Sequence, residues 1–171
     1  MDRILPESGT ARSPFSSKTA VDYELLLAQV LEIIREDPWY VAALSNISAL
    51  IFQTLPDLNW AGFYLLRGGR LVVGPFQGKP ACIHIDAGKG VCGAAIERDE
   101  VLTVPDVHLF PGHIACDSAS KSEIVLPIHR CGQVAAVLDI DSPILSRFTE
   151  DDRRGLERVT GAIEAGISWT A

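Results

Sequence analysis

Hydrophobic residues recur at helical spacing near both ends of the chain. Residues 19–36 are predicted to form an amphipathic helix, with Thr19 and Asp22 as a capping pair and an apolar stripe of Leu26, Val30, Ile33 and Ile34. A second helix is predicted from Pro38, a favoured first-turn residue, to about Leu55. Thr149 is the predicted cap of a final helix, whose stripe comprises Leu156, Val159, Ile163 and Ile167.

Between these helices the apolar positions form short runs that are separated by turns. Residues 59–66 and 70–76 flank a Gly-Gly turn, and residues 122–130 and 133–142 flank Cys131-Gly132, so each pair predicts an antiparallel hairpin. Residues 81–85 predict a third short strand, residues 91–98 a short helix, and a further short strand ends at Pro105. Because hairpins dominate and helices lie at the ends, we expect an α/β fold of the α+β type, with helices packed on an antiparallel sheet.

Length, composition and charge narrow the class of protein. The chain has 171 residues, and its first 18 are rich in Ser and Pro, so we expect a flexible tail at 1–18 and a single domain at 19–171. The formal charge is −7 without a basic cluster, which argues against nucleic acid as a partner. No apolar run reaches the ~20 residues of a membrane span, and the N-terminus lacks a signal-peptide core. A cytoplasmic protein without a membrane partner is therefore expected.

The chain has four cysteines and no C-x-x-C pair: Cys82, Cys92, Cys116 and Cys131. Cys116 is the first candidate for chemistry, because it lies in a long polar loop, residues 105–120, that is typical of a lid or binding loop. Cys92 stands at the head of a predicted helix, where the helix dipole lowers a thiol pKa, so it is a second candidate. The competing interpretation is that each cysteine is a small, inert filler.

The histidines give little support for a metal site. His84, His108 and His113 are placed near Cys82 or Cys116 along the chain, but none of them has a zinc-type spacing. We therefore expect no metal. His113 precedes Cys116 by three residues and is therefore close enough to change the reactivity of its thiol, although a solvated loop histidine is the commoner case.

Three carboxylates and two aromatic residues complete the candidate set. Asp139 and Asp141 lie on one face of a predicted strand, and hairpin pairing brings Glu123 beside them. Clustered acids are costly unless they bind a cation or share a proton, and the alternative is a solvated sheet end. Trp60 and Tyr64 share another strand face, either as core residues or as the wall of a binding site.

Together these motifs resemble one enzyme family. The segments NWAGFYLL, GPFQGK, ACI, GVCG, GHIACDSAS, SEIVLP and VLDIDS are similar to those of free methionine-(R)-sulfoxide reductases, over roughly residues 20–168. The resemblance implies a GAF fold: a central antiparallel sheet with helices on one face and a lid loop over the pocket on the other. It implies Cys116 as the catalytic thiol, Cys82 as the resolving thiol and Cys92 as the third cysteine of the family; Cys131 has no counterpart.

The resemblance also implies a substrate and a mechanism. Glu123, Asp139 and Asp141 would line the pocket for free methionine-(R)-sulfoxide, and Trp60 would contact the substrate methyl group. Cys116 would become a sulfenic acid and then a disulfide, which thioredoxin reduces, with no metal or organic cofactor. The resemblance also implies a homodimer, the typical assembly of the family. Two other functions stay open: a GAF sensor that binds a small ligand, and a thiol redox sensor without turnover. The cysteine pattern argues against the first, and an assay with free methionine sulfoxide tests the second.

Overall fold

The computed structural model describes residues 21–114 and 116–170, so the predicted tail at 1–18 lies outside the described residues. The α-helices of the described part are α1 (Tyr23–Glu36), α2 (Tyr40–Thr54), α3 (Gly90–Arg98) and α4 (Glu150–Gly166). The strands are β1 (Trp60–Arg67), β2 (Arg70–Gly78), β3 (His84–Asp86), β4 (Leu102–Val104), β5 (Ser122–Arg130) and β6 (Gln133–Ser142). A 3₁₀ turn, η1 (Val107–Leu109), lies in the long loop before β5.

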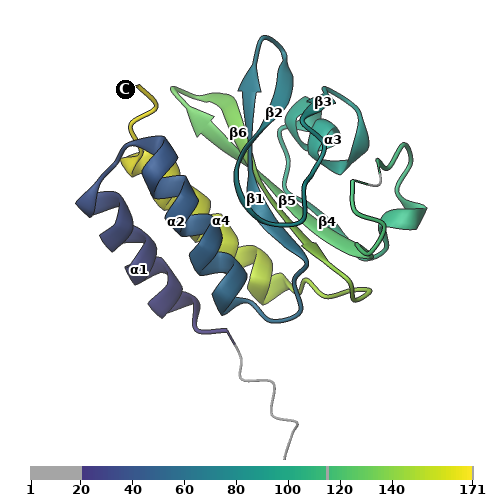
Figure 1. Ribbon diagram of the computed structural model, residues 1–171, viewed down its shortest axis with the longest axis horizontal. Coiled ribbons are helices and arrows are strands. Elements are labelled where there is room, and N and C mark those ends of the chain that lie inside the picture. The colour runs from purple at the N-terminus through teal and green to yellow at the C-terminus, as the bar shows by residue number, and fades with distance from the viewer. Residues whose placement is uncertain (1–20, 115, 171) are drawn as a thin grey trace, which may run out of the picture.

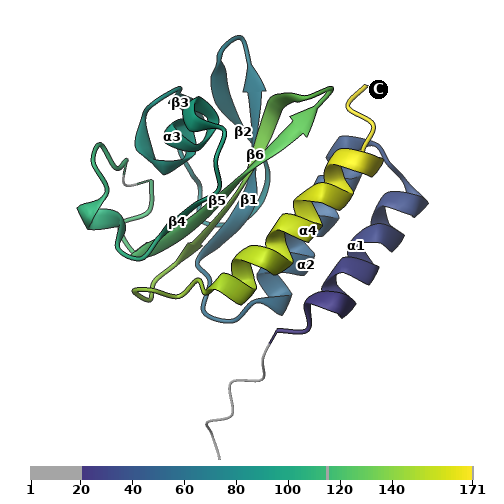
Figure 2. The same ribbon diagram turned by 180° about the vertical axis from the view of Figure 1, so that it is seen from behind.

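The strands form one antiparallel sheet with the order β3-β2-β1-β6-β5-β4. Helices α2 and α4 cover one face of this sheet, and α1 packs against both of them from outside (Figures 1 and 2). The short helix α3 lies on the other face together with the loop of residues 105–120 (Figure 1). This confirms the predicted antiparallel sheet with helices on one face, and it adds α3 to the face that carries the loop.

Each face of the sheet has its own hydrophobic core. Phe63, Leu126 and Leu138 point from neighbouring strands into the core beneath α2 and α4, and all three are fully buried. On the other face, Tyr64 and Val125 pack against Val91 and other residues of α3. Because side chains alternate along a strand, one residue turns toward the helices and the next turns toward α3 and the loop.

Local sequence signals explain several element boundaries. The Asp22 carboxylate accepts a hydrogen bond from the backbone N–H of Leu25 at 3.0 Å, which caps α1; Thr19 lies outside the described residues. Thr149 caps α4 as predicted, and the structure adds a reciprocal capping box with Asp152. The β5–β6 turn has positive φ at both central residues, Cys131 (52°) and Gly132 (74°), as a two-residue hairpin turn requires.

Three predicted boundaries are wrong. Helix α1 begins at Tyr23 rather than at residue 19, because Asp22 is its N-cap. Helix α2 begins at Tyr40 rather than Pro38, because the Pro38 carbonyl and the Tyr40 N–H both pair with the backbone of Ser168, at 2.7 and 3.0 Å. The third strand is His84–Asp86 rather than residues 81–85, and its pairing with β2 begins only at His84. Among the described residues, no helix is both long and apolar enough to cross a membrane.

Candidate active site

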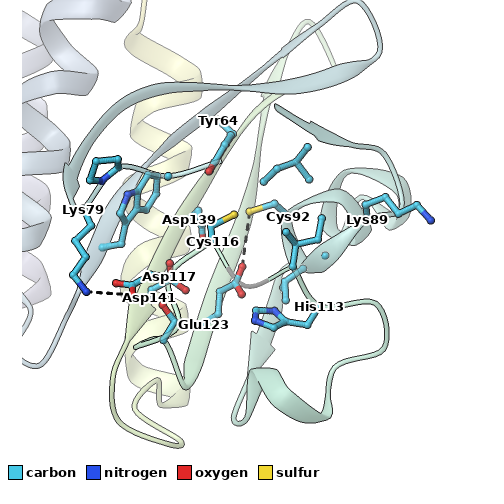
Figure 3. Close-up of a pocket in the computed structure, with 18 residues that line it drawn as sticks. Tyr64, Lys79, Lys89, Cys92, His113, Cys116, Asp117, Glu123, Asp139 and Asp141 are labelled. Atoms are coloured by element: carbon cyan, nitrogen blue, oxygen red, sulfur yellow. Dashed lines mark hydrogen bonds and ion pairs between the residues drawn. The ribbon is translucent and has the colours of Figure 1, made fainter. Parts of the chain in front are cut away.

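Two of the four cysteines are joined on the α3 side of the sheet. A disulfide links Cys82, which precedes β3, to Cys116 in the long loop, across 34 residues of sequence. Cys92 lies in the first turn of α3 and is buried, with 3% of its surface exposed. Cys131 is exposed at the β5–β6 turn. The disulfide therefore brings together two of the three predicted site cysteines. The third, Cys92, lines a cavity that Cys116 also lines (Figure 3).

The strand register brings the three predicted carboxylates together. Glu123 of β5 is the pairing partner of Asp141 in β6, and Asp139 lies two residues earlier on the same face. Glu123 and Asp139 are each only 6% exposed. The Cys92 thiol lies 3.8 Å from a Glu123 carboxylate oxygen, as the dashed line in Figure 3 marks. The alternative of a solvated sheet end is therefore wrong for Glu123 and Asp139.

Burial changes the protonation of this cluster. Desolvation, followed by the charges of Asp139 and Asp141, raises the pKa of Glu123 well above its usual range. Desolvation also raises the pKa of Asp139, although its polar neighbours Cys92 and Glu123 oppose the rise. For Asp141 the causes are desolvation and then the charge of Asp139. The cluster therefore holds protons more tightly than exposed carboxylates do, and a cation that enters the cavity would favour its ionised form.

The expected low pKa of Cys92 is wrong. The helix start was predicted to lower this pKa, but desolvation of the fully buried thiol and the nearby Asp139 and Glu123 raise it well above the usual value. A helix dipole acts only through partial charges, whereas Cys92 is shielded from solvent beside two carboxyl groups whose ionised forms disfavour a thiolate. Cys92 is therefore held as a neutral thiol in the structure.

Aromatic rings form another wall of the site. Trp60 stacks on Tyr64 at a centroid distance of 5.7 Å and on Phe76 at 5.2 Å. The Tyr64 hydroxyl donates to the Cys82 carbonyl at 3.1 Å, so it also fixes the segment that carries Cys82. Trp60 and Tyr64 thus belong both to the core and to the lining of the cavity. Phe76 was not predicted, although its place opposite Gly62 follows from the register of β1 and β2.

The loop that carries Cys116 is fastened over the cavity by polar contacts. The Asn59 side-chain amide donates to Asp117 at 3.1 Å and to Ser120 at 2.9 Å. Lys79 forms an ion pair with the same Asp117 carboxylate at 3.3 Å. On the opposite side, the Gly90 N–H of α3 donates to the Gly112 carbonyl at 3.1 Å. Asp117 therefore joins the loop to Asn59 and Lys79, and neither Asn59 nor Ser120 was predicted as a site residue.

The cavity beneath the loop is small and polar at its base. It holds about 40 Å³ of free space between Trp60, Cys116, Glu123 and Asp139 (Figure 3). His113 also lines it; burial lowers the pKa of this histidine, and its buried Nδ1 has no hydrogen-bond partner. Of the described residues, the group with ligand atoms close enough for one cation is Cys92, Glu123 and Asp139, and not the histidines considered from the sequence.

Residues 40–167 match the GAF domain family. The free methionine-R-sulfoxide reductase of Escherichia coli is 52% identical over 131 residues, which cover 77% of this chain and 79% of that protein. The protein of the same name from Saccharomyces cerevisiae is 46% identical and covers 72% of this chain and 73% of its own. The solved structure of the free methionine-R-sulfoxide reductase from Neisseria meningitidis in complex with its substrate is 37% identical, has a TM-score of 0.83, and covers 88% of this chain and 92% of that chain. With this similarity along most of its length, the chain belongs to the GAF domain family and, within it, to the free methionine-R-sulfoxide reductases.

Proposed function

We propose that this protein reduces free L-methionine-(R)-sulfoxide to methionine, with Cys116 as the attacking thiol and Cys82 as the resolving thiol. The observation that carries the proposal is the Cys82–Cys116 disulfide at the wall of a cavity that contains three acids. A disulfide of this kind is the product that one round of sulfoxide reduction would leave. The names of the relatives from E. coli and S. cerevisiae support the same reaction.

The proposed reaction has three steps. The Cys116 thiolate attacks the sulfoxide sulfur, the sulfoxide oxygen takes a proton, and methionine leaves while Cys116 becomes a sulfenic acid. The Cys82 thiol then attacks the Cys116 sulfur, which releases water and forms the disulfide. A dithiol reductant finally returns both cysteines to thiols. The sulfoxide sulfur gains two electrons, Cys116 and Cys82 supply them, and the external dithiol replaces them.

The carboxylates are suited to two tasks in this scheme. Glu123 has a raised pKa, so it can hold the proton that the sulfoxide oxygen needs. Asp139 and Asp141, ionised by the arrival of a cation, are suited to the ammonium group of a free amino acid. The Trp60 ring, which lines the cavity and stacks on Phe76 behind it, offers an apolar surface for the substrate methyl group. Glu123 and Asp139 are equally buried, which supports both tasks because a buried carboxyl group needs either a proton or a cationic partner.

Cys92 has a different place in the scheme. Its thiol is buried and neutral beside Glu123, and Cys82 already occupies the position next to Cys116. We therefore assign the resolving role to Cys82 and keep Cys92 as a third thiol that contacts Glu123. Thioredoxin as the electron donor, the homodimer and the cytoplasmic location stay predictions from the sequence.

Methionine release from free methionine-(R)-sulfoxide, with dithiothreitol as the reductant, tests the proposed function. Cys116→Ser should abolish turnover, and Cys131→Ser, which alters an exposed thiol in a remote turn, should keep the wild-type rate. The N-acetylated sulfoxide lacks the ammonium group and should be a far poorer substrate. Normal kinetics of Cys116→Ser, or equal rates on the two substrates, would contradict the proposal.

Mass spectrometry tests the assignment of the resolving cysteine. After one equivalent of substrate and no added reductant, Cys82→Ser should release methionine and accumulate a sulfenic acid on Cys116. Peptide mapping of the wild type should show the Cys82–Cys116 bond that the structure contains. A Cys92–Cys116 bond as the main product would move the resolving role to Cys92.

A further inference from the structure

Three buried ligand atoms meet at the base of the cavity. The Sγ atom of Cys92 and one carboxylate oxygen each from Glu123 and Asp139 all lie within 4.8 Å of one another. The three side chains come from α3, β5 and β6, and Figure 3 shows them converging from different sides. In tetrahedral zinc sites with sulfur and oxygen ligands, bond lengths of about 2.3 and 2.1 Å place the ligand atoms roughly 3.5 Å apart. Small rotations of the side chains therefore suffice to close this group around one ion.

A second observation also points to a cationic ligand. Asp139 is 6% exposed and lines the cavity, yet its Oδ1 atom is buried and has no hydrogen-bond partner. A buried carboxylate oxygen without a partner is unfavourable, and it is normally explained by an ion, a water or a ligand. Of the lysines that line the cavity, Lys79 is paired with Asp117 and Lys89 points away in Figure 3. Neither of them supplies the positive charge.

The donor set selects a class of cation. A thiolate with two carboxylates suits a borderline ion such as Zn²⁺, whereas Mg²⁺ and Ca²⁺ prefer six or more oxygen ligands. The free space of about 40 Å³ is enough for an ion and a water, and His113 offers an unpartnered Nδ1 at the same cavity. The Cys82–Cys116 disulfide does not consume Cys92, so all three ligands exist in the oxidised protein.

We propose that Cys92, Glu123 and Asp139 form a binding site for Zn²⁺ or a similar divalent transition cation, and that this cation and the substrate exclude each other. On binding, the Cys92 thiol proton is lost to solvent and a metal–sulfur bond replaces the S–H bond. The mutual exclusion of cation and substrate rests on the proposed function, because it assumes that the substrate ammonium group binds the same carboxylates. The site would make the enzyme sensitive to free zinc when methionine sulfoxide is scarce.

Cobalt substitution tests the site without any turnover. The oxidised protein should be titrated with Co²⁺, whose bond to a thiolate gives a charge-transfer band in the near ultraviolet, and excess Zn²⁺ should abolish the band. Cys92→Ser should lose the band. Asp139→Asn should bind Co²⁺ at least about 100-fold more weakly. Loss of a residue that only orients a metal ligand already costs up to about 100-fold in metal affinity, and Asp139 is itself a proposed ligand. Cys131→Ser is the matched control, because it removes the other free thiol and should keep the band.

The outcomes separate the two proposals. A band that persists in Cys92→Ser, a band that disappears in Cys131→Ser, or no saturable band in a folded wild type would overturn the metal site. Free L-methionine-(R)-sulfoxide, which the oxidised protein cannot reduce, should weaken Co²⁺ binding at least about tenfold through reciprocal coupling, and the N-acetylated sulfoxide should not. Unchanged Co²⁺ affinity would overturn the exclusion. If the proposed function fails instead, methionine release is absent while the cobalt band remains.

Discussion

Asn59 fastens the loop of Cys116 through two hydrogen bonds, and its replacement tests how much they contribute. Its side-chain amide donates to Asp117 and to Ser120, which lie 58 and 61 residues later in the chain. Asp117 directly follows Cys116, and Ser120 is 5% exposed. Replacing Asn59 by Ala removes both donors and leaves the loop backbone unchanged. The loop should then open more often, because its closed arrangement loses two contacts.

The size of the effect follows from the two hydrogen bonds. A hydrogen bond to a charged acceptor contributes about 1.5–3 kcal/mol and a neutral one about 0.5–1.5 kcal/mol, so Asn59→Ala should cost the closed loop roughly 2–4 kcal/mol. At 1.4 kcal/mol per tenfold change, the open fraction should rise roughly 30- to 1,000-fold while it is still small. Asp117 keeps the hydrogen bond from the Ala119 N–H at 3.0 Å, so the turn at residues 117–119 should survive.

Two measurements report on this opening. Amide hydrogen exchange of residues 111–120 and the rate at which dithiothreitol reduces the Cys82–Cys116 disulfide should both rise in Asn59→Ala. Lys79→Ala is the matched control, because Lys79 contacts the same carboxylate from the surface and is 67% exposed. An exposed ion pair contributes about 0–1 kcal/mol, so this variant should change either rate less than about fivefold. Equal effects of the two variants would refute the reasoning.

Two further predictions concern stability. Gly155→Ala should destabilise the protein by about 1–3 kcal/mol relative to Gly161→Ala on the same helix. A Cβ atom at Gly155 would lie 2.1 Å from the Tyr23 ring, whereas one at Gly161 meets nothing within 4 Å. Equal free energies of unfolding in urea would contradict this prediction. Hydrogen bonds with Glu164 and then Asp99 raise the pKa of His129. The stability that the protonated His129 contributes to the fold is therefore complete below its unfolded pKa, and it is lost as the pH rises through its folded pKa. As pH rises from the unfolded pKa of about 6.5 through the higher folded pKa, the wild type should therefore lose stability relative to His129→Gln, and parallel pH curves would contradict that.

The parts of the site that the sequence predicts are those fixed by local pattern. The spacing of Asp139 and Asp141 defines one strand face, and a two-residue turn at Cys131-Gly132 sets the register that brings Glu123 opposite Asp141. Alternation likewise places Trp60 and Tyr64 on one face, where they stack. Strand periodicity and turn chemistry act within a few residues, so the sequence contains all the information that these predictions need.

The parts that the sequence does not predict depend on contacts between distant segments. The pKa of Cys92 was predicted to be low from its place in a helix, but its direction is set by burial against β5 and β6. Asn59 fastens a loop that lies 58 residues away, and nothing near Asn59 in the sequence indicates this partner. The third strand begins late because its pairing with β2 starts only at His84, so Cys82 is left outside the strand.

The buried acids lower the stability of the fold. An acid whose folded pKa lies above its unfolded value destabilises the fold increasingly as pH rises through that interval, because the unfolded chain ionises first. Desolvation places Glu123 and Asp139 in this position, and the orphaned Oδ1 of Asp139 adds to the cost. Any positive group that binds there recovers part of this free energy, whether it is the ammonium of an amino acid or a metal ion. The burial that makes these acids unfavourable is therefore the feature that would give the pocket affinity for a cationic ligand.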